Sequence, residues 1–401
     1  MQIILQKKYS ISLQKITHLN LMNILFNCTT NIVGGGLKNS AFFIKKAVED
    51  ENFHWHFAVC RPVYSMLEEW ELNLDKAKFT IFENSPSRNI NARKDLRKLS
   101  ESLKIDLVYT MAGPAFVKFP CSHLQGISNG YITHADWESF RFRKGLVKTL
   151  KDYAHVSIQF FYTLKASDFV FQTKYAKDTF KRRSKIKEER LNVISNAFDL
   201  SLRDYFNQET NTIQNSKESE ITILCPGAGH LHKGFQFIPE IAKELKNISN
   251  KKFKFVLTLP FDSQLWLHIK SEIERLNLKE CITNHGPYKY TNLKNLLKTC
   301  NIVFVPSLLE TFSASYLEAM CAKKKLVAAD KNFAREVCRN YATYIKPQDG
   351  IGTAKAINEI FSNINITKEE LALSNEILSN YGNQDQRFEK IKALINNLIS
   401  N

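Results

Sequence analysis

The sequence predicts an α/β protein that is built from two Rossmann-like domains in tandem. Short apolar runs alternate with helix-periodic segments over nearly the whole length, which is the pattern of a parallel, doubly wound sheet. A polar stretch at residues 206–220 interrupts this alternation, and the alternation then starts again. A chain of 401 residues, of which 44% are hydrophobic, is long enough to bury two sizeable cores.

The predicted strands are short apolar runs bounded by polar or turn residues. In the first half they lie at 23–28, 55–60, 78–82, 107–112, 168–173 and 191–195. Helices between them are predicted at 37–49, 63–71, 91–104, 140–166 and 174–183. In the second half the strands lie at 221–225, 254–259, 301–305, 325–329 and 342–346. Apolar stripes predict helices there at 236–247 and 263–276.

These patterns divide the chain into five parts. Residues 1–21 are expected to be a loose extension or the product of an upstream misread start, because lysines break up the segment and no signal-peptide core is present. The first domain spans 22–205, the linker 206–220 and the second domain 221–366. A helical tail at 367–401 follows, and it could pack back on the first domain.

Charge and cysteine content restrict the partners and the compartment. Lysine and arginine number 56 against 40 acidic residues, a formal net charge of +16. This excess favours an anionic partner such as nucleic acid, an acidic membrane surface or a phosphorylated substrate, and the alternative is a solvated basic face. The 8 cysteines are dispersed without a C-x-x-C pair, which fits buried thiols in a reducing cytoplasm. No apolar run is long enough for a membrane-spanning helix.

A glycine cluster, Gly34-Gly35-Gly36, follows the first predicted strand and precedes a helix. Glycines there let the backbone approach a phosphate, and the helix N-terminus supplies N–H donors. The alternative is a tight turn without a ligand. The spacing is not G-x-G-x-x-G, and the second strand ends at Cys60 rather than at an acidic residue, so a dinucleotide site is disfavoured.

Lys233 and Gly234 lie between the first strand of the second domain and its helix. A lysine at this position can reach a diphosphate as a point charge, and the alternative is a surface lysine. The segment does not match the Walker P-loop. His230 and His232 have no further ligands nearby in the sequence, which makes a metal site unlikely on spacing alone.

The stretch at 306–322, PSLLETFSASYLEAMCA, is the most informative one. Glu310 is expected on a loop after a strand, and Glu318 near the start of the next helix. Such a pair can address two ends of one ligand that lies across a helix N-terminus. The alternatives are a solvated loop carboxylate for Glu310, and for Glu318 a capping box formed by Ser315-x-x-Glu318.

Taken together, these motifs resemble those of the retaining glycosyltransferases of family 4, also called glycosyl transferases group 1. The resemblance rests on Lys233-Gly234 and on Pro306-Ser307-x-x-Glu310-x7-Glu318-Ala319-Met320. Softer matches are Val327-Ala328-Ala329-Asp330, Glu336-Val337, Pro347-x-Asp349, Asp168-Phe169-Val170 and Ile194-Ser195-Asn196 through Asp199. The resemblance covers about residues 22–365. It implies the glycosyltransferase-B fold, in which two Rossmann-like domains face a cleft, the first binding the acceptor and the second the donor.

The resemblance also implies a role for each matching residue. Lys233, beside Gly234, would contact the donor diphosphate, Glu310 would hold hydroxyls of the donor sugar near the reacting carbon, and Glu318 would bond the ribose. The remaining donor-binding positions are the amides of Thr311, Phe312 and Ser313 at the phosphates, Gly35 and Gly36 at the same diphosphate, and Gly286 and Tyr288 at the base. The family generally works without a metal or other cofactor, and the chain has no D-x-D motif.

Two positions depart from the family pattern. Ala228 occupies the place of an arginine that usually precedes the lysine. Either His230 or another cation replaces that arginine, or diphosphate binding is weaker. The family often has a histidine near the reacting sugar, and here it would be His134 or His123, or be missing. We take His134 as the candidate, and the alternative is a loop histidine.

The leading hypothesis is a retaining enzyme that moves a sugar from a nucleotide sugar to a glycan or lipid-linked acceptor in surface polysaccharide or lipopolysaccharide synthesis. Basic segments at 141–151 and 174–190 could hold it on the inner face of the cell membrane, and the alternative is a solvated helix face. No nucleic-acid motif accompanies the charge. Two alternative functions are a nucleotide-sugar epimerase of the same fold and a non-catalytic anion- or membrane-binding module.

Overall fold

The computed structural model describes residues 21–32, 34–75, 77–136, 139–140, 146–208 and 220–400. Residues 1–20 of the predicted extension, 209–219 of the predicted linker and 141–145 of the first basic segment lie outside the described residues. In the part that is described, no helix is long and apolar enough to cross a membrane.

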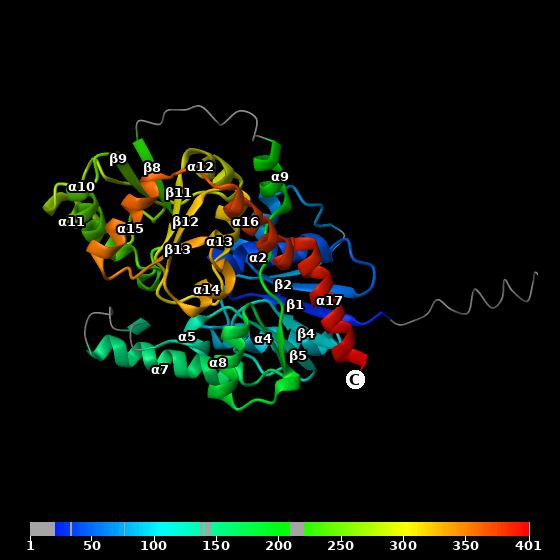
Figure 1. The fold of residues 1–401 in the computed structure, drawn as a ribbon. Coiled ribbons are helices and arrows are strands. Elements are labelled where there is room, and N and C mark those ends of the chain that lie inside the picture. Colours follow the sequence, from blue (N-terminus) through cyan, green and yellow to red (C-terminus); the bar gives the residue numbers. More distant parts are fainter. Residues whose placement is uncertain are drawn as a thin grey trace, which may run out of the picture.

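The first domain contains a seven-stranded sheet whose neighbouring strands are all parallel (Figure 1). Its strands are β1 (Asn23–Cys28), β2 (His54–Cys60), β3 (Lys78–Phe82), β4 (Leu107–Thr110), β5 (Ser122–Ile127), β6 (Asp168–Phe171) and β7 (Leu191–Val193). Their order is β3-β2-β1-β4-β5-β6-β7. The sequence did not indicate β5, because polar residues and a glycine break its apolar pattern.

The second domain contains a six-stranded parallel sheet. Its strands are β8 (Glu220–Cys225), β9 (Lys252–Leu257), β10 (Ile282–Asn284), β11 (Ile302–Val305), β12 (Lys325–Ala329) and β13 (Ala342–Ile345). Their order is β10-β9-β8-β11-β12-β13. Strand β10 was not predicted, since three residues carry too little pattern. The expected fold class is confirmed, because both sheets are parallel and helices cover them.

Helices connect the strands, and helix-capping residues fix where several of them start. In the first domain the helices are α2 (Gly34–Ala47), α3 (Arg61–Glu69), α4 (Ile90–Ser102), α5 (Gly130–Thr133), α7 (Leu146–Thr163) and α8 (Lys174–Ser184). In the second they are α10 (Ile238–Ile248), α11 (Gln264–Arg275), α12 (Leu293–Thr299), α13 (Ala314–Cys321), α14 (Asn332–Cys338) and α15 (Gly350–Ser362). Helix α9 (Leu200–Gln208) also lies on the second domain, where Leu202 and Phe206 join the buried core. Asn89, Thr173 and Asp349 cap α4, α8 and α15 by accepting from backbone amides of the first turn.

The last two helices lie against different domains. Helix α16 (Lys368–Tyr381), which starts with a Thr367–Glu370 capping box, packs on α13 of the second domain. Helix α17 (Gln384–Ser400) packs on α2 of the first domain, beside β1 and β2 (Figure 1). The ring of Phe388 lies 5.1 Å from that of Phe43, which stacks at 4.5 Å on Phe26 of β1. The end of the chain therefore completes the core of the first domain.

The chain crosses between the domains at two adjacent places. The amide of Phe198 donates to the carbonyl of Gly382 at 3.1 Å, and Phe198 and Asn383 form an isolated parallel bridge. At the first crossing, near Phe198, the chain leaves the first domain and enters α9. At the second crossing, near Asn383, the chain leaves α16 and returns to the first domain as α17. Because both crossings lie side by side, they form one connection on one side of the interdomain space.

Each sheet reverses its direction of growth at one point, between β1 and β4 in the first domain and between β8 and β11 in the second. In a parallel sheet, loops that leave neighbouring strands in opposite directions open a crevice at the carboxyl ends of those strands. The topology therefore predicts that ligands bind at the loops after β1, β4, β8 and β11.

Candidate functional site

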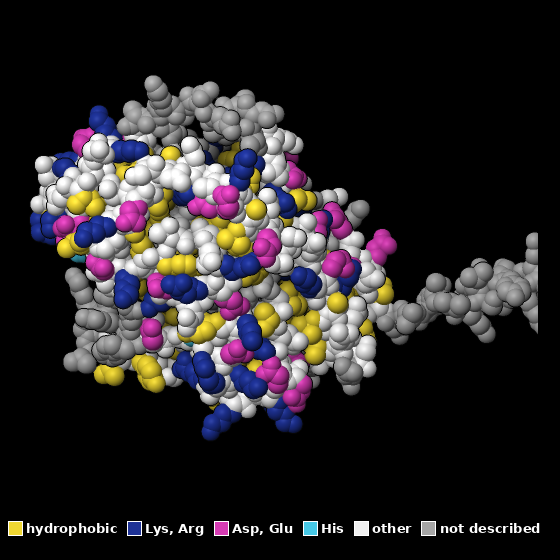
Figure 2. Space-filling model, in the orientation of Figure 1, with side chains coloured by type: hydrophobic (Ala, Val, Ile, Leu, Met, Phe, Trp, Pro, Cys, Tyr) yellow, Lys and Arg dark blue, Asp and Glu magenta, His cyan; other side chains and the backbone are white. Residues whose placement is uncertain are grey.

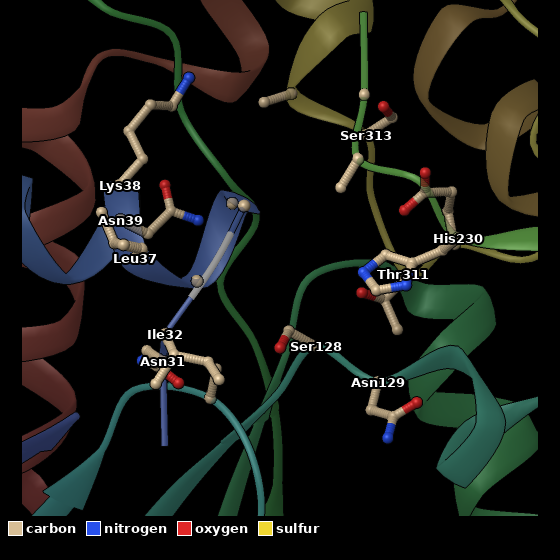
Figure 3. A pocket seen from close by; sticks show the side chains of 18 of the residues that line it. Asn31, Ile32, Leu37, Lys38, Asn39, Ser128, Asn129, His230, Thr311 and Ser313 are labelled. Atoms are coloured by element: carbon tan, nitrogen blue, oxygen red, sulfur yellow. The ribbon is translucent and has the colours of Figure 1, made fainter. Parts of the chain in front are cut away.

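A cavity of about 840 Å³ lies between the two domains. Its lining comes from segments that follow β1, β4 and β5 in the first domain and β8, β9 and β11 in the second. Figure 3 shows residues of both domains on opposite sides of this pocket, with Lys38 on one side and His230, Thr311 and Ser313 on the other. The cavity thus lies at both predicted crevices.

Lys233 and Glu310 form an ion pair in this cavity. Lys233 ends a short 3-10 turn (Leu231–Lys233) after β8, and Glu310 lies on the loop after β11. The Lys233 ammonium donates to Oε1 of Glu310, and the side chains are only 20% and 13% exposed. The amide of Leu308 donates to the carbonyl of His232 at 2.7 Å, so a backbone hydrogen bond holds the two loops together.

Gly234 shapes the turn that carries Lys233 and does not itself line the cavity. Its φ is +76°, and a Cβ at this position would lie 2.1 Å from the carbonyl oxygen of Pro306. Any side chain would therefore meet both backbone strain and a backbone clash. Gly234 thus has a conformational role, and the expected donor contact stays a prediction.

The start of α13 faces the cavity. Ser313 is the N-cap, and its side chain makes no capping hydrogen bond. The first amides of a helix have no acceptor within the helix, so this end can bind an anion. Thr311 is fixed from the first domain, because its hydroxyl donates to Oε1 of Gln172 at 2.8 Å. Phe312 lines the cavity and packs edge-on against Tyr381 at 5.3 Å.

Glu318 lies in the second turn of α13 and pairs with a lysine of the other domain. The Lys38 ammonium, on α2, lies 2.5 Å from Oε1 of Glu318, and the side chains are 14% and 12% exposed. The same ammonium lies 4.3 Å from the ring centroid of Tyr290. The capping-box interpretation of Ser315 and Glu318 is wrong, because α13 starts after Ser313 and Glu318 bonds Lys38 instead.

The glycine cluster forms the first turn of α2, so this helix begins at Gly34 and not at residue 37 as predicted. Gly34 has a φ of +67°. A Cβ on Gly34 or Gly35 would meet no atom within 4 Å, whereas one on Gly36 would contact Asn31. The backbone of Gly34 and Gly35 therefore borders open cavity space.

Tyr288 and Tyr290 line the far end of the second-domain wall. The Tyr290 hydroxyl donates to Oδ2 of Asp199 at 2.9 Å, and burial raises the pKa of the Tyr288 phenol. Gly286 does not line the cavity. With a φ of +83° and a Cβ position 2.5 Å from the Phe261 ring, Gly286 sets the course of the loop, and its contact with the base stays a prediction.

Neither candidate histidine lines the cavity. The His134 ring lies 5.0 Å from that of Tyr175 and 5.6 Å from that of Phe333, and burial lowers the pKa of His134 to about 4. His123 lies in β5, where its Nε2 is 2.9 Å from the Thr110 hydroxyl, and burial lowers its pKa to about 3. Both are neutral in the folded chain. An interaction with the backbone of Glu310 raises the pKa of His134 against the larger effect of burial, so His134 lies beside the Glu310 loop although it does not line the cavity.

The buried histidines lead to a prediction about pH. Below about pH 6.5 the unfolded chain protonates them, whereas the folded chain keeps His134 neutral to about pH 4 and His123 to about pH 3. Because the unfolded state binds more protons, acidification from pH 6.5 should lower the free energy of unfolding by about 1.4 kcal/mol per pH unit for each histidine. Chemical denaturation near pH 7 and near pH 5 measures this. His123→Gln should reduce the difference between the two pH values, and an unchanged difference would contradict the assignment.

The comparison with known proteins identifies the second half of the chain. Residues 207–376 match the family model described as "Glycosyl transferases group 1". This part of the chain is a group 1 glycosyltransferase domain. The match includes Lys233, Glu310 and Glu318, and the resemblance stated from the sequence is confirmed.

A curated relative of the group 1 glycosyltransferase domain is the O-antigen chain mannosyltransferase RfbU of Salmonella typhimurium, which is 22% identical over 225 residues. This alignment covers 56% of the chain and 57% of that protein, so the chain spans little more than half the length of this relative.

Solved glycosyltransferase structures match almost the whole chain. The glycosyltransferase from Rickettsia africae has a TM-score of 0.69 at 16% identity, with 95% of this chain and 100% of that chain covered. Anabaena HepE in complex with UDP and glucose has a TM-score of 0.68 at 16% identity, with 94% and 100% covered. Sucrose-phosphate synthase from Thermosynechococcus elongatus has a TM-score of 0.70 at 14% identity, with 94% of this chain and 99% of that chain covered. These likenesses confirm the glycosyltransferase-B fold.

Sequence reasoning missed several residues that line the cavity beside the group 1 glycosyltransferase domain. They are Lys38, Arg88, Ser128, Asn129, His155 and Gln159. Asn129 follows β5, and its Nδ2 donates to Oε1 of Gln159 on α7 at 2.9 Å. Gln159 Nε2 lies 2.9 Å from His155 Nε2. Since β5 itself was not predicted, its loop carried no signal, whereas Lys38 follows the glycine cluster by two positions and could have been noted.

Ala228, which occupies the position of the expected arginine, does line the cavity. His230 lies beside it and stacks on His232, with ring centroids 5.3 Å apart. Burial first, and then the neighbouring Lys233 charge, lower the pKa of His230 below its usual 6.5. Without a ligand, His230 therefore carries little positive charge near pH 7.

Proposed function

We propose that the chain is a retaining glycosyltransferase that transfers a sugar from a nucleotide-diphosphate sugar to a glycan or lipid-linked saccharide. The proposed process is the synthesis of surface polysaccharide or lipopolysaccharide. The observation that carries this proposal is the meeting of Lys233, Glu310, Glu318 and the start of α13 with the glycine turn of α2 in one cavity. The O-antigen relative supports the acceptor class.

The charges in the cavity suit the chemistry of glycosyl transfer. As the bond to the anomeric carbon breaks, negative charge grows on the leaving diphosphate, and preorganised donors in a closed site stabilise that charge. Lys233 and the first amides of α13 supply such donors. Glu310 lies against Lys233, and from there its carboxylate can accept hydrogen bonds from hydroxyls of the sugar. We propose that the reaction needs no metal, as the family resemblance implies.

Binding of nucleotides tests this proposal directly. Thermal unfolding of the wild type is measured with UDP, GDP, ADP and NAD, since a ligand at 100 times its Kd should add about 2.7 kcal/mol of stability. We expect stabilisation by one diphosphate. Sugar transfer from the matching nucleotide sugar then distinguishes a transferase from an epimerase, which would turn over the donor alone. Absence of any nucleotide response would favour the anion-binding module.

We further propose that the acceptor approaches from an anionic membrane at the cytoplasmic face. One side of α7 carries His155 and Gln159 toward the cavity. Its other side exposes Leu150, Tyr153, Ile158 and Phe161, which are 65%, 59%, 51% and 56% exposed. Hydrophobic side chains lie at the lower edge of the molecule, where α7 runs (Figure 1 and Figure 2).

Basic side chains border this apolar face of α7. Lys151 and Lys165 are exposed on or directly after the helix, and the last turn of α8 adds Lys181, Arg182 and Arg183. The two helices are adjacent, because the Arg183 guanidinium lies 4.6 Å from the Phe160 ring centroid. An apolar stripe between cations matches an interface of lipid tails and anionic headgroups.

Co-sedimentation with vesicles tests the membrane proposal. The protein should bind vesicles that contain phosphatidylglycerol and not pure phosphatidylcholine vesicles, and added salt should weaken this binding. Replacing Leu150 and Phe161 by Glu should weaken it by at least about tenfold, because two apolar side chains leave the interface. Ile351→Glu on α15, at a side chain that is 58% exposed, is the matched control. Equal binding by the α7 variant and the control would refute the proposal.

A further inference from the structure

The described lining of the cavity contains few groups that can neutralise a diphosphate. Its lysines and arginines are Lys38, Arg88 and Lys233, and its carboxylates are Glu310 and Glu318. Arg88 is exposed to solvent, which screens its charge. Ala228 carries no charge, and Lys233 alone would have to balance two phosphate groups if no other residue contributed.

Lys38 is held at the cavity wall by its position on α2. It follows the glycine turn directly, in the second turn of the helix. Its neighbour Asn39 donates to Oδ1 of Asn196 at 3.0 Å, which fixes this part of α2. The ammonium of Lys38 lies 2.5 Å from Glu318 and 4.3 Å from the Tyr290 ring centroid, with the side chain 14% exposed. A cation that is this little exposed interacts strongly with an entering anion.

Without a ligand, the cavity contains two lysine–glutamate pairs, Lys38 with Glu318 and Lys233 with Glu310. A nucleotide sugar offers a diphosphate that suits the ammonium groups and sugar hydroxyls that suit the carboxylates. When the nucleotide sugar binds, each lysine can exchange its carboxylate partner for a phosphate group. Each carboxylate can then accept hydrogen bonds from sugar hydroxyls. This exchange leaves no buried charge without a partner.

We infer that Lys38 is the second cation for the donor diphosphate and that it acts from the first domain in place of the arginine absent at Ala228. This inference rests on the proposed function. The diphosphate then lies between Lys38 of one domain and Lys233 of the other, and it replaces the direct Lys38–Glu318 contact between the domains.

Calorimetric titration tests the role of Lys38. The ligands are the nucleoside diphosphate that stabilises the wild type, its monophosphate and its nucleoside. Lys38→Met should weaken diphosphate binding by about 10- to 100-fold, the effect of removing one charge-assisted hydrogen bond. The loss should be smaller for the monophosphate and absent for the nucleoside, and Lys38→Arg should retain most of the affinity. Lys45→Met, at an exposed lysine of the same helix, is the matched control and should bind as the wild type does.

The outcomes separate this inference from the proposed function. If Lys38→Met binds the diphosphate as tightly as the wild type, or more tightly, Lys38 only competes for Glu318 and the inference is wrong. An equal loss for nucleoside and diphosphate would also overturn it, because the effect would then not involve phosphate. If the wild type binds no nucleotide at all, the proposed function fails and the inference fails with it. The unfolding midpoint of each variant without ligand shows whether the fold is intact.

Discussion

Glu310→Gln and Lys233→Ala are each expected to lower kcat/KM for sugar transfer by at least about 100-fold, which is the usual effect of losing one preorganised transition-state contact. The two side chains form one partly buried ion pair, so each variant removes a charge and also leaves its partner without a counterion. Lys233→Ala should raise the KM for the donor as well as lower kcat, because the diphosphate is bound in both the ground state and the transition state. Glu310→Gln should act mainly on kcat, because the amide keeps the shape of the carboxylate but not its charge.

The measurement is steady-state transfer with the nucleotide sugar whose diphosphate stabilises the wild type. Lys243→Ala is the control, since Lys243 lies on α10 of the same domain with a side chain that is 43% exposed. It should retain full activity. Circular dichroism and the unfolding midpoint establish that the variants are folded. Full activity in both Glu310→Gln and Lys233→Ala would disprove the site.

Gly234→Ala is expected to destabilise the protein by about 3 kcal/mol. An alanine at a φ of +76° costs about 1–2 kcal/mol in backbone strain, and a Cβ at 2.1 Å from the Pro306 carbonyl forces the two loops apart at a further cost of about 1–3 kcal/mol. Because these loops carry Lys233 and Glu310, the variant should also lose activity. Denaturant unfolding of the wild type and the variant measures the change.

Gly35→Ala is the matched comparison, and we expect it to weaken diphosphate binding without lowering the stability of the fold. Its Cβ meets no atom within 4 Å, so the fold should keep its stability or gain up to about 1 kcal/mol from a better helix former. The new methyl group would lie at the cavity wall and should weaken diphosphate binding. If Gly234→Ala is as stable as the wild type, the close approach to Pro306 is not a constraint. If Gly35→Ala binds the diphosphate normally, the glycine turn does not contact it.

Most of the strands could be predicted from the sequence because they are buried on both faces. Such strands appear as continuous apolar runs, and β1 and β12 lie at the predicted residues. The edge strand β3, which is only partly buried, also lies at the predicted residues. Strand β5 could not be predicted, because His123 and Gly126 break its apolar pattern. The Nε2 atom of His123 lies 2.9 Å from the Thr110 hydroxyl of the neighbouring strand, and Gly126 is required because a Cβ there would lie 2.1 Å from the Met111 carbonyl oxygen. Both contacts join β5 to the neighbouring strand and the segment after it, so they are not visible in the sequence of β5 alone.

The site divides in the same way. Lys233 and Glu310 each follow a strand of the same sheet, and the family resemblance of their motifs indicated a shared site. Their loops meet because β8 and β11 are neighbours in the sheet, which the structure shows. His134 lies beside the Glu310 loop but does not line the cavity, and its place in the sequence gave no sign that Tyr175 and Phe333 would enclose it.

The sequence by itself therefore determined the fold class, the two domains with their strand–helix repeats, and the Lys233 and Glu310 motifs. These depend on hydrophobic periodicity and on short-range order along the chain. Only the tertiary structure decided that Lys38 meets Glu318, 280 positions away, and that α17 completes the core of the first domain. Such contacts arise where two separately folded domains pack against each other, and no local pattern encodes the relative position of two surfaces.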